Sequence, residues 1–419
     1  MTRHPAEISD ELIARIAGAV GTPVWIYETA AIERQIEKLR AFDVIRYAQK
    51  ANSNLGILRV MRRNGVVVDA VSLGEIDRAL AAGFTASADK AEIVLAADVL
   101  DRQTLRRVAA LGLPVNCGSP DMIRQIGEAS PRHPIWLRIN PGFGHGHSAK
   151  TNTGGPSSKH GIWFDQLPEC LQMVERFGVS LIGLHMHIGS GVDYGHLGRV
   201  CGSMVESVKQ LGRPIEAISA GGGLSVPYRP GEAEVDTQHY FELWDRTRRA
   251  VSDACGSHVR LEIEPGRYLV AGCGKLVAEV RAIKKVADNY FVLVDAGFNE
   301  LVRPMIYGSH HEIRFVSTSG RAPSDEVHPM AIAGPLCEAG DVFTQREGGV
   351  VEYRRLPLPS VGDLAVFDDA GAYGASMSSN YNSRPLAPEV MVDAGKAVLV
   401  RRRQEMPELL ALEASALEI

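Results

Sequence analysis

The chain has 419 residues, of which 45% are hydrophobic and 23% are charged, and its formal net charge is -5. This composition is typical of a soluble globular protein with room for one large domain and a smaller one. The charge argues against a nucleic-acid partner, and the sequence has neither an apolar run that would span a bilayer nor a signal-peptide core. We therefore expect a cytoplasmic protein with no membrane partner.

Eight short apolar runs alternate with helical patterns in the first two thirds of the chain. Strands separated by helices indicate parallel βαβ units, and eight such units predict a (β/α)8 barrel of the TIM type. An open doubly wound sheet is the structural alternative. The early gaps hold the helical patterns 57–64, 74–82 and 101–111. The expected strands are residues 44–48, 66–70, 93–96, 114–116, 135–139, 181–187, 217–220 and 260–264.

The pattern changes after about residue 272. Residues 276–280, 290–294 and 364–367 read as strands joined by Gly-rich turns, and helical periodicity is scarce. This favours a second, mostly β domain over residues 273–419, after a barrel over residues 31–272. We expect the N-terminal segment 1–30, with its strand-like run at residues 23–27, to contribute to the β domain. The last stretch, residues 407–419, predicts a short helix.

One long segment, residues 142–161, is rich in Gly, Ser, Thr, His and Lys and follows the fifth expected strand. A loop of this length in a compact domain is either functional or disordered. We expect an active-site lid, and a disordered segment is the alternative.

The six cysteines are spread along the chain without a CxxC pair, so we expect no structural zinc site and no metal. In a chain of this size in the cytosol we expect free thiols. Five of them are most simply small buried hydrophobic residues, and Cys337 is considered separately below.

Polar signals lie at the ends of the expected strands, where barrel enzymes build their active sites. Lys50 follows the first strand, the segment 187–191 (HIGSG) follows the sixth, and residues 221–223 (GGG) follow the seventh. Glycine turns at strand ends expose backbone N–H groups that suit a phosphate. Glu264 ends the eighth strand, where a carboxylate needs a partner.

Each of these signals has an ordinary structural explanation. Lys50 could be a solvated loop lysine, the glycines could simply make tight turns, and His187 could be a core histidine. Glu264 could pair with Arg267. Together, however, an inward lysine, two phosphate turns and an inward carboxylate fit one cofactor, pyridoxal 5'-phosphate, with its aldehyde, phosphate and ring nitrogen.

These residues lie in sequence blocks that resemble those of the fold-type III pyridoxal-phosphate-dependent decarboxylases, which are built on alanine-racemase-like barrels. Within this family, the blocks are most similar to those of enzymes that act on diaminopimelate. The resemblance runs in order from about residue 20 to 400, which makes it specific. The blocks are residues 47–52 (YAQKAN), 71–75 (VSLGE), 142–161, 185–192 (HMHIGSGV), 221–225 (GGGLS), 264–267 (EPGR), 303–307 (RPMIY), 337–341 (CEAGD) and 371–385 (GAYGASMSSNYNSRP).

The resemblance implies three catalytic residues. Lys50 would bind the cofactor as a Schiff base, His187 would stack on its ring, and Cys337 would protonate the carbanion. The implied cofactor-binding residues are Lys50, Asp69, His187, Ser190, Gly222, Gly223, Glu264, Pro265, Gly266, Arg267 and Tyr373. The implied substrate-binding residues are Arg267, Arg303, Tyr307, Glu338 and Tyr373. In this family the residues that match Cys337 and Glu338 reach the active site of the other subunit, so the resemblance implies a homodimer with shared sites.

The implied reaction is loss of CO2 from the D-centre of meso-diaminopimelate to give L-lysine. Glu264 would keep the ring nitrogen protonated and so favour decarboxylation, whereas the related racemases place an arginine there. The planar fork of Arg303 suits a distal carboxylate, and Glu338 would pair with a distal ammonium. The alternatives are a related decarboxylase that acts on another amino acid, either free or carrier-bound, a non-catalytic cofactor-binding barrel and a racemase.

Overall fold

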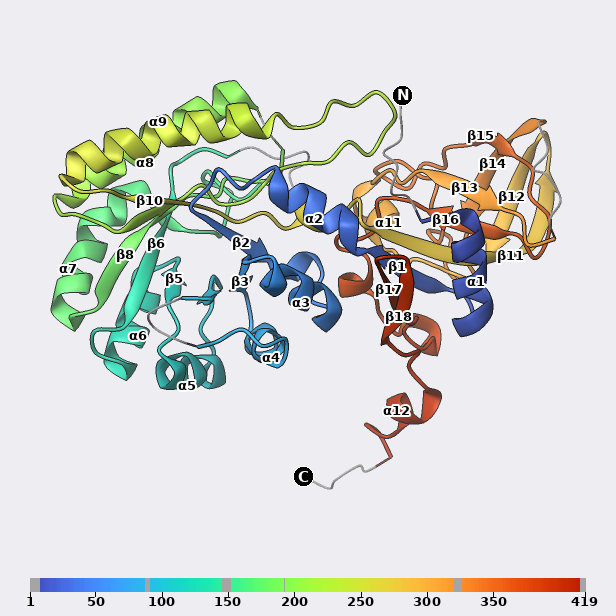
Figure 1. Cartoon of the computed structure of the whole chain (residues 1–419), viewed down its shortest axis with the longest axis horizontal. Coiled ribbons are helices and arrows are strands. Elements are labelled where there is room, and N and C mark those ends of the chain that lie inside the picture. Colours follow the sequence, from blue (N-terminus) through green and yellow to red (C-terminus); the bar gives the residue numbers. More distant parts are fainter. Residues whose placement is uncertain (1–7, 87–90, 145–151, 192, 320–325, 415–419) are drawn as a thin grey trace. The chain divides into compact units, whose positions relative to one another are not determined.

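The computed structural model of the chain consists of two compact units (Figure 1). It describes residues 8–86, 91–144, 152–191, 193–319 and 326–414. The first unit holds Glu33–Val226 and Ala233–Leu269, and the second holds the N-terminal residues up to Ile32, the segment Pro227–Glu232 and the chain from Val270 onward. Among the residues described, no helix is both long enough and apolar enough to cross a membrane.

The first unit is a closed barrel of eight parallel strands. Strand β10 (Arg260–Ile263) pairs with β2 (Val44–Ala48), which closes the barrel. The strands between them, in order, are β3 (Val67–Ala70), β4 (Ile93–Leu95), β5 (Val115–Cys117), β6 (Pro134–Asn140), β8 (Ser180–His185) and β9 (Ala217–Ser219), and the short β7 (Ile162–Trp163) pairs with β6. These eight strands coincide with the eight predicted runs, so the barrel is confirmed and the open sheet is wrong.

Helices lie on the outer side of the barrel strands (Figure 1). Their ends follow local signals: the side chain of Asp101 accepts hydrogen bonds from Gln103 N and Thr104 N at the start of α5, and Gly112 ends that helix in the left-handed region. The barrel helices are α3 (Leu55–Arg63), α4 (Leu73–Ala81), α5 (Arg102–Leu111), α6 (Pro120–Ala129), α7 (Leu167–Phe177), α8 (Tyr194–Leu211) and α9 (Thr237–Cys255), and α2 (Thr29–Glu37) crosses the boundary between the two units.

The second unit is built on a mostly antiparallel sheet. Strand β1 (Val24–Glu28) pairs antiparallel with β11 (Gly274–Val286) and parallel with β17 (Glu389–Asp393). Helix α1 (Asp10–Val20) covers the sheet, and its Ile13 and Ile16 pack in one cluster with strand valines. The other strands are β12 (Asn289–Val294), β13 (Ile313–Val316), β14 (Val327–Ala333), β15 (Arg354–Pro357), β16 (Leu364–Phe367) and β18 (Lys396–Arg401), and the other helices are α10 (Arg267–Val270), which crosses the boundary between the units, α11 (Arg303–Tyr307) and α12 (Met406–Leu410).

Two local predictions need correction. All six cysteines are free, as predicted, but only Cys117, Cys170, Cys201 and Cys273 are buried. Cys255 is half-buried because it is the last residue of α9, directly before the capping Gly256. The C-terminal helix α12 is shorter than predicted, and residues 415–419 lie outside the described residues.

Candidate active site

Lys50 lies at the carboxyl end of the first barrel strand. It belongs to a short 3-10 helix, Gln49–Ala51, that begins where β2 ends. Its two neighbours, Gln49 and Ala51, are fully buried, whereas the Lys50 side chain is exposed. The positive charge of Lys50 acts on the pKa values of Asp69 and His187. The ammonium is therefore accessible to a ligand and close to other predicted site residues.

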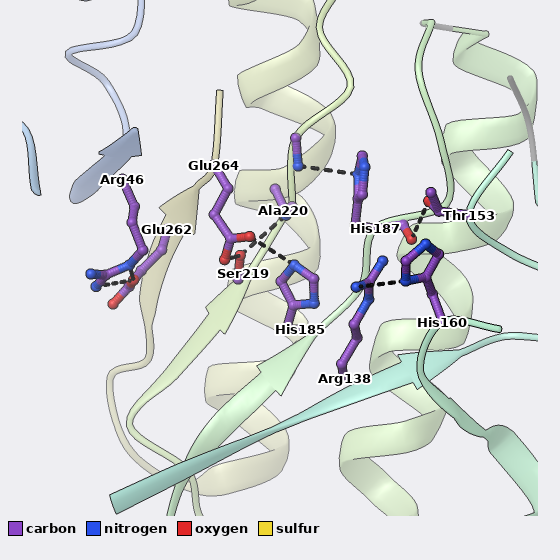
Figure 2. A network of polar contacts seen from close by, with 12 residues as sticks. Arg46, Arg138, Thr153, His160, His185, His187, Ser219, Ala220, Glu262 and Glu264 are labelled. Atoms are coloured by element: carbon purple, nitrogen blue, oxygen red, sulfur yellow. Dashed lines mark hydrogen bonds and ion pairs between the residues drawn. The ribbon is translucent and has the colours of Figure 1, made fainter. Parts of the chain in front are cut away.

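Glu264 is held at the end of β10 by two side chains, one from β8 and one from β9 (Figure 2). Its Oε2 lies 2.9 Å from His185 Nε2, and its Oε1 accepts a hydrogen bond of 2.8 Å from Ser219 Oγ. Burial raises the pKa of Glu264, but His185, Ser219 and the charge of Arg46 outweigh it and lower this pKa to about 2. Glu264 is consequently an anion at any physiological pH.

A buried ion pair lies one layer below Glu264. Glu262 is two residues earlier on the same strand and therefore faces the same side of β10. Its Oε2 lies 2.9 Å from Arg46 Nη2, and both side chains are almost fully buried (Figure 2). Arg46 of this pair lies near enough that its positive charge helps to lower the pKa of Glu264.

The two glycine turns come together beside His187. The His187 ring accepts a hydrogen bond on Nδ1 from Gly222 N at 3.3 Å (Figure 2), and Gly223 O accepts one from Gly191 N at 2.8 Å. A Cβ on Gly223 would lie 2.3 Å from Gly189 O, and the φ of Gly223 is +101°. Only glycine fits so close a backbone approach. Ser190 is half-buried in the same turn.

His187 is neutral at physiological pH. Burial and the positive charges of Arg138 and Lys50 hold the pKa of His187 well below its ordinary value. An uncharged imidazole does not repel a cationic ligand, so a flat contact with a protonated aromatic ring is allowed on electrostatic grounds.

Asp69 carries a buried oxygen without a partner. Asp69 lies in β3, and only 5% of it is exposed. Its Oδ1 has no hydrogen-bond partner among the described residues. Burial and the charge of Glu264 raise the pKa of Asp69 well above its ordinary value. The environments of these two neighbouring carboxyl groups thus drive their pKa values in opposite directions, which is common at functional sites.

The segment from Glu264 to Arg267 packs against the end of β2. Pro265 O accepts a hydrogen bond of 3.2 Å from Ala48 N, and a Cβ on Gly266 would lie 3.1 Å from Ala48 O. Arg267 is half-buried and begins α10. Ala48, which makes both contacts, lies two residues before Lys50 in the chain.

The long loop after β6 touches the same barrel end. Thr153 N donates to Ile188 O at 3.2 Å, and Thr153 Oγ1 donates to His187 O at 3.0 Å. The central residues of the expected lid, 145–151, lie outside the described residues. Lid motion therefore stays a prediction.

The second unit carries the remaining predicted residues. Arg303 begins α11 and is 4% exposed, and Tyr307 ends the same helix half-buried. Tyr373 is half-buried with a φ of +57°.

Cys337 and Glu338 are exposed on a turn that is firmly held. Cys337 N donates to Asn382 Oδ1 at 3.0 Å, and Leu336 N donates to Asp341 Oδ2 at 2.7 Å. A thiol and a carboxylate are thus presented side by side on a rigid surface.

Several residues that build this site were not predicted from the sequence. His185, Ser219, Arg46 and Arg138 all come from barrel strands, and Asp341 and Asn382 hold the Cys337 turn. One signal was available: a charged or polar residue at an inward position of an apolar strand, such as Arg46, needs a buried partner.

The barrel end fits pyridoxal phosphate. The Lys50 amine is accessible, neither Gly222 nor Gly223 has room for a Cβ, Glu264 is ionised, and Asp69 Oδ1 has no hydrogen-bond partner among the described residues. An amine, backbone N–H groups and a carboxylate are the groups that an aldehyde, a phosphate and a protonated ring nitrogen require.

Comparisons with known proteins agree with this reading. A family model described as pyridoxal-dependent decarboxylase, pyridoxal binding domain, matches residues 29–271. A diaminopimelate decarboxylase of Streptomyces coelicolor is 61% identical over 411 residues, which cover 98% of this chain and 93% of the relative. A crystal structure of diaminopimelate decarboxylase superposes with a TM-score of 0.95 at 56% identity, covering 98% of this chain and 97% of that one.

A more distant structure shares the fold as well. The diaminopimelate decarboxylase from Helicobacter pylori complexed with L-lysine has a TM-score of 0.85 at 28% identity, and the match covers 97% of this chain and 100% of that one. The family match spans more than half of the chain, and the relatives cover nearly all of it. The chain therefore belongs to the diaminopimelate decarboxylase family of pyridoxal-dependent decarboxylases.

Proposed function

We propose that the chain decarboxylates meso-diaminopimelate at its D-centre and releases CO2 and L-lysine, with pyridoxal phosphate at the carboxyl end of the barrel strands. The observation that carries the proposal is the carboxylate of Glu264 at the end of β10, where His185 Nε2 at 2.9 Å and Ser219 Oγ at 2.8 Å help to lower its pKa. When bound, the cofactor supplies an electron sink for the electrons of the broken Cα–carboxylate bond. Glu264 keeps the proton on the ring nitrogen and so strengthens this sink.

Other barrel residues bind and orient the cofactor. Lys50 would hold it through its amine, and His187 would lie against the ring. The phosphate is bound by backbone N–H groups and side chains at the glycine turns, where the close backbone approach supports an anion site. The residues assigned to cofactor binding are Lys50, Asp69, His187, Ser190, Gly222, Gly223, Glu264, Pro265, Gly266, Arg267 and Tyr373.

The end of the substrate that does not react carries its own carboxylate and ammonium. Arg303 binds this carboxylate, because a guanidinium fork matches two carboxylate oxygens. Glu338 pairs with the ammonium, and Arg267, Tyr307 and Tyr373 complete the substrate contacts. A substrate with a distal cation alone, such as ornithine, offers no carboxylate to the buried Arg303.

Cys337 is the acid that delivers the proton to the substrate carbon after CO2 has left. We propose that Cys337 and Glu338 act in the site of a second copy of the chain, so that the enzyme is a homodimer. Their exposure on a well-held turn supports this role. A free thiol of this kind persists in a reducing compartment, which supports a cytoplasmic location.

The alternatives fit less well. A racemase calls for a weaker electron sink than the anionic Glu264 provides, and a non-catalytic barrel has no use for the second unit. A related decarboxylase of another amino acid, free or carrier-bound, does not require Arg303 and Glu338 to bind a distal carboxylate and ammonium together.

A substrate panel tests the proposal. We expect the purified enzyme with pyridoxal phosphate to release CO2 from meso-diaminopimelate at least about 1,000-fold faster, by kcat/KM, than from ornithine, arginine or lysine, because the last three lack the second amino-acid end that Arg303 and Glu338 recognise together. A higher kcat/KM on any of the other three would contradict the substrate assignment.

A further inference from the structure

Arg303, the residue assigned to the distal carboxylate, makes a buried contact with a histidine of the same unit. Its Nη1 lies 3.0 Å from His311 Nε2, and both side chains are almost completely buried. A guanidinium has only N–H donors and no acceptor. His311 Nε2 must therefore accept this hydrogen bond with its lone pair.

The other ring nitrogen of His311 points to the same tautomer. His311 Nδ1 lies 3.0 Å from the backbone carbonyl oxygen of Asp368, which is an acceptor only. Nδ1 must therefore carry the hydrogen, and Nε2 is left free to accept. Burial and the neighbouring cations Arg303 and Arg354, together with His310, hold the pKa of His311 well below its ordinary value, so the ring stays neutral.

An aromatic ring supports the guanidinium from a second direction. The Arg303 Cζ lies 4.7 Å from the centroid of the Tyr228 ring, in cation–π geometry. Tyr228 also packs edge-on against His311, with ring centroids 5.6 Å apart at 76°. Tyr228 and His311 thus fix the plane of the guanidinium and one of its terminal nitrogens.

We propose that His311, supported by Tyr228, is a positioning residue that sets the orientation of Arg303 for the carboxylate of the substrate's non-reacting amino-acid end. This inference rests on the proposed role of Arg303 in substrate binding. A guanidinium that rotates freely loses the entropic advantage of a fixed fork, and the carboxylate then binds less tightly.

A pair of ligands isolates the carboxylate contact. L-Lysine, the proposed product, and 1,5-diaminopentane have the same carbon chain and both amines, but only L-lysine has the carboxylate. Calorimetry on the enzyme loaded with pyridoxal phosphate gives the ratio of their dissociation constants. We expect L-lysine to bind more tightly, and this ratio measures what Arg303 and its surroundings contribute.

Three variants separate the roles. We expect Arg303→Met to bring the ratio close to one. His311→Leu should reduce the ratio roughly 10-fold by loosening Arg303, whereas His311→Gln should keep it within about 3-fold of wild type, because an amide can accept from Arg303 and donate to the Asp368 carbonyl at once. In turnover, His311→Leu should raise the KM for diaminopimelate roughly 10-fold and change kcat less than about 3-fold.

The outcomes distinguish the two proposals. An unchanged ratio in Arg303→Met contradicts the role of Arg303 in the proposed function. A ratio that falls in Arg303→Met but not in His311→Leu overturns the positioning role of His311 alone.

A spectroscopic measurement keeps the inference testable even if His311→Leu does not fold. Nitrogen-15 NMR of histidine-labelled wild type should show His311 as the neutral Nδ1–H tautomer between pH 6 and pH 8, with its signal assigned by its absence in His311→Gln. A charged ring or the Nε2–H tautomer would overturn the proposal.

Discussion

Replacement of Glu264 by glutamine is the sharpest perturbation of the barrel site. The glutamine keeps the shape and the hydrogen-bonding capacity of the side chain but removes its charge. In the folded protein the pKa of Glu264 falls from its ordinary 4.5 to about 2, so His185, Ser219 and Arg46 favour the charged form. This shift corresponds to about 3 kcal/mol in favour of the anion.

We expect Glu264→Gln to lower kcat by about 100-fold, because a neutral amide no longer attracts the proton on the ring nitrogen; this fold-change corresponds to about 3 kcal/mol in the barrier. Cofactor affinity should change less than about 10-fold, because Lys50 and the glycine turns still bind it. Steady-state CO2 release gives kcat, and titration of the cofactor absorbance gives its affinity. Ser219→Ala is the graded control: it removes one hydrogen bond but keeps the carboxylate, so its loss in kcat should be smaller.

The same variant has a predicted effect on acid stability. A carboxylate with a lowered pKa stabilises the folded state fully above its unfolded pKa of 4.5, and this stabilisation is lost as the pH falls toward 2. Between these pH values the free energy of unfolding of the cofactor-free protein should therefore fall less steeply in Glu264→Gln than in wild type. A wild-type kcat in Glu264→Gln, together with a wild-type fall in the free energy of unfolding at acid pH, would contradict the assigned role of the Glu264 charge.

Further predictions concern the other groups of the site. Lys50→Ala should abolish both the absorbance of covalently bound cofactor and CO2 release; a retained band would remove its assigned role. Gly223→Ala should weaken cofactor binding at least about 10-fold, because its Cβ would lie 2.3 Å from Gly189 O, whereas Gly212→Ala, with nothing within 4 Å of its Cβ, should cost only about 1 kcal/mol in thermal unfolding and leave the cofactor bound. A mixture of Lys50→Ala and Cys337→Ala proteins should recover about a quarter of wild-type activity, since half of randomly exchanged dimers hold one intact site; exchange without recovery would exclude a shared site.

The barrel could be predicted from the sequence because its strands are short apolar runs separated by regular helices. Lys50 and Glu264 were visible for the same reason, since each directly follows such a run. The partners of Glu264 were not visible, because His185 and Ser219 become its neighbours only when β8, β9 and β10 lie side by side in the closed barrel.

The second unit was predicted less completely. Its strands pair over long sequence separations, such as β1 with β17, and no local pattern encodes such pairing. The contact of Tyr228 with Arg303 is of the same kind, since the tyrosine comes from a segment between two barrel elements. The Cys337 turn was found only through a sequence block, because a lone cysteine has no periodicity to interpret.

The most direct test of the proposed reaction measures both of its products, CO2 and lysine. Purified enzyme with pyridoxal phosphate is incubated with meso-diaminopimelate, and the CO2 released and the chirality of the lysine formed are measured. We expect one CO2 for each lysine and only the L enantiomer, because the D-centre reacts while Arg303 holds the other end. D-lysine or a racemic product would contradict the assigned orientation of the substrate, and no CO2 from enzyme that carries bound cofactor would contradict the proposed reaction.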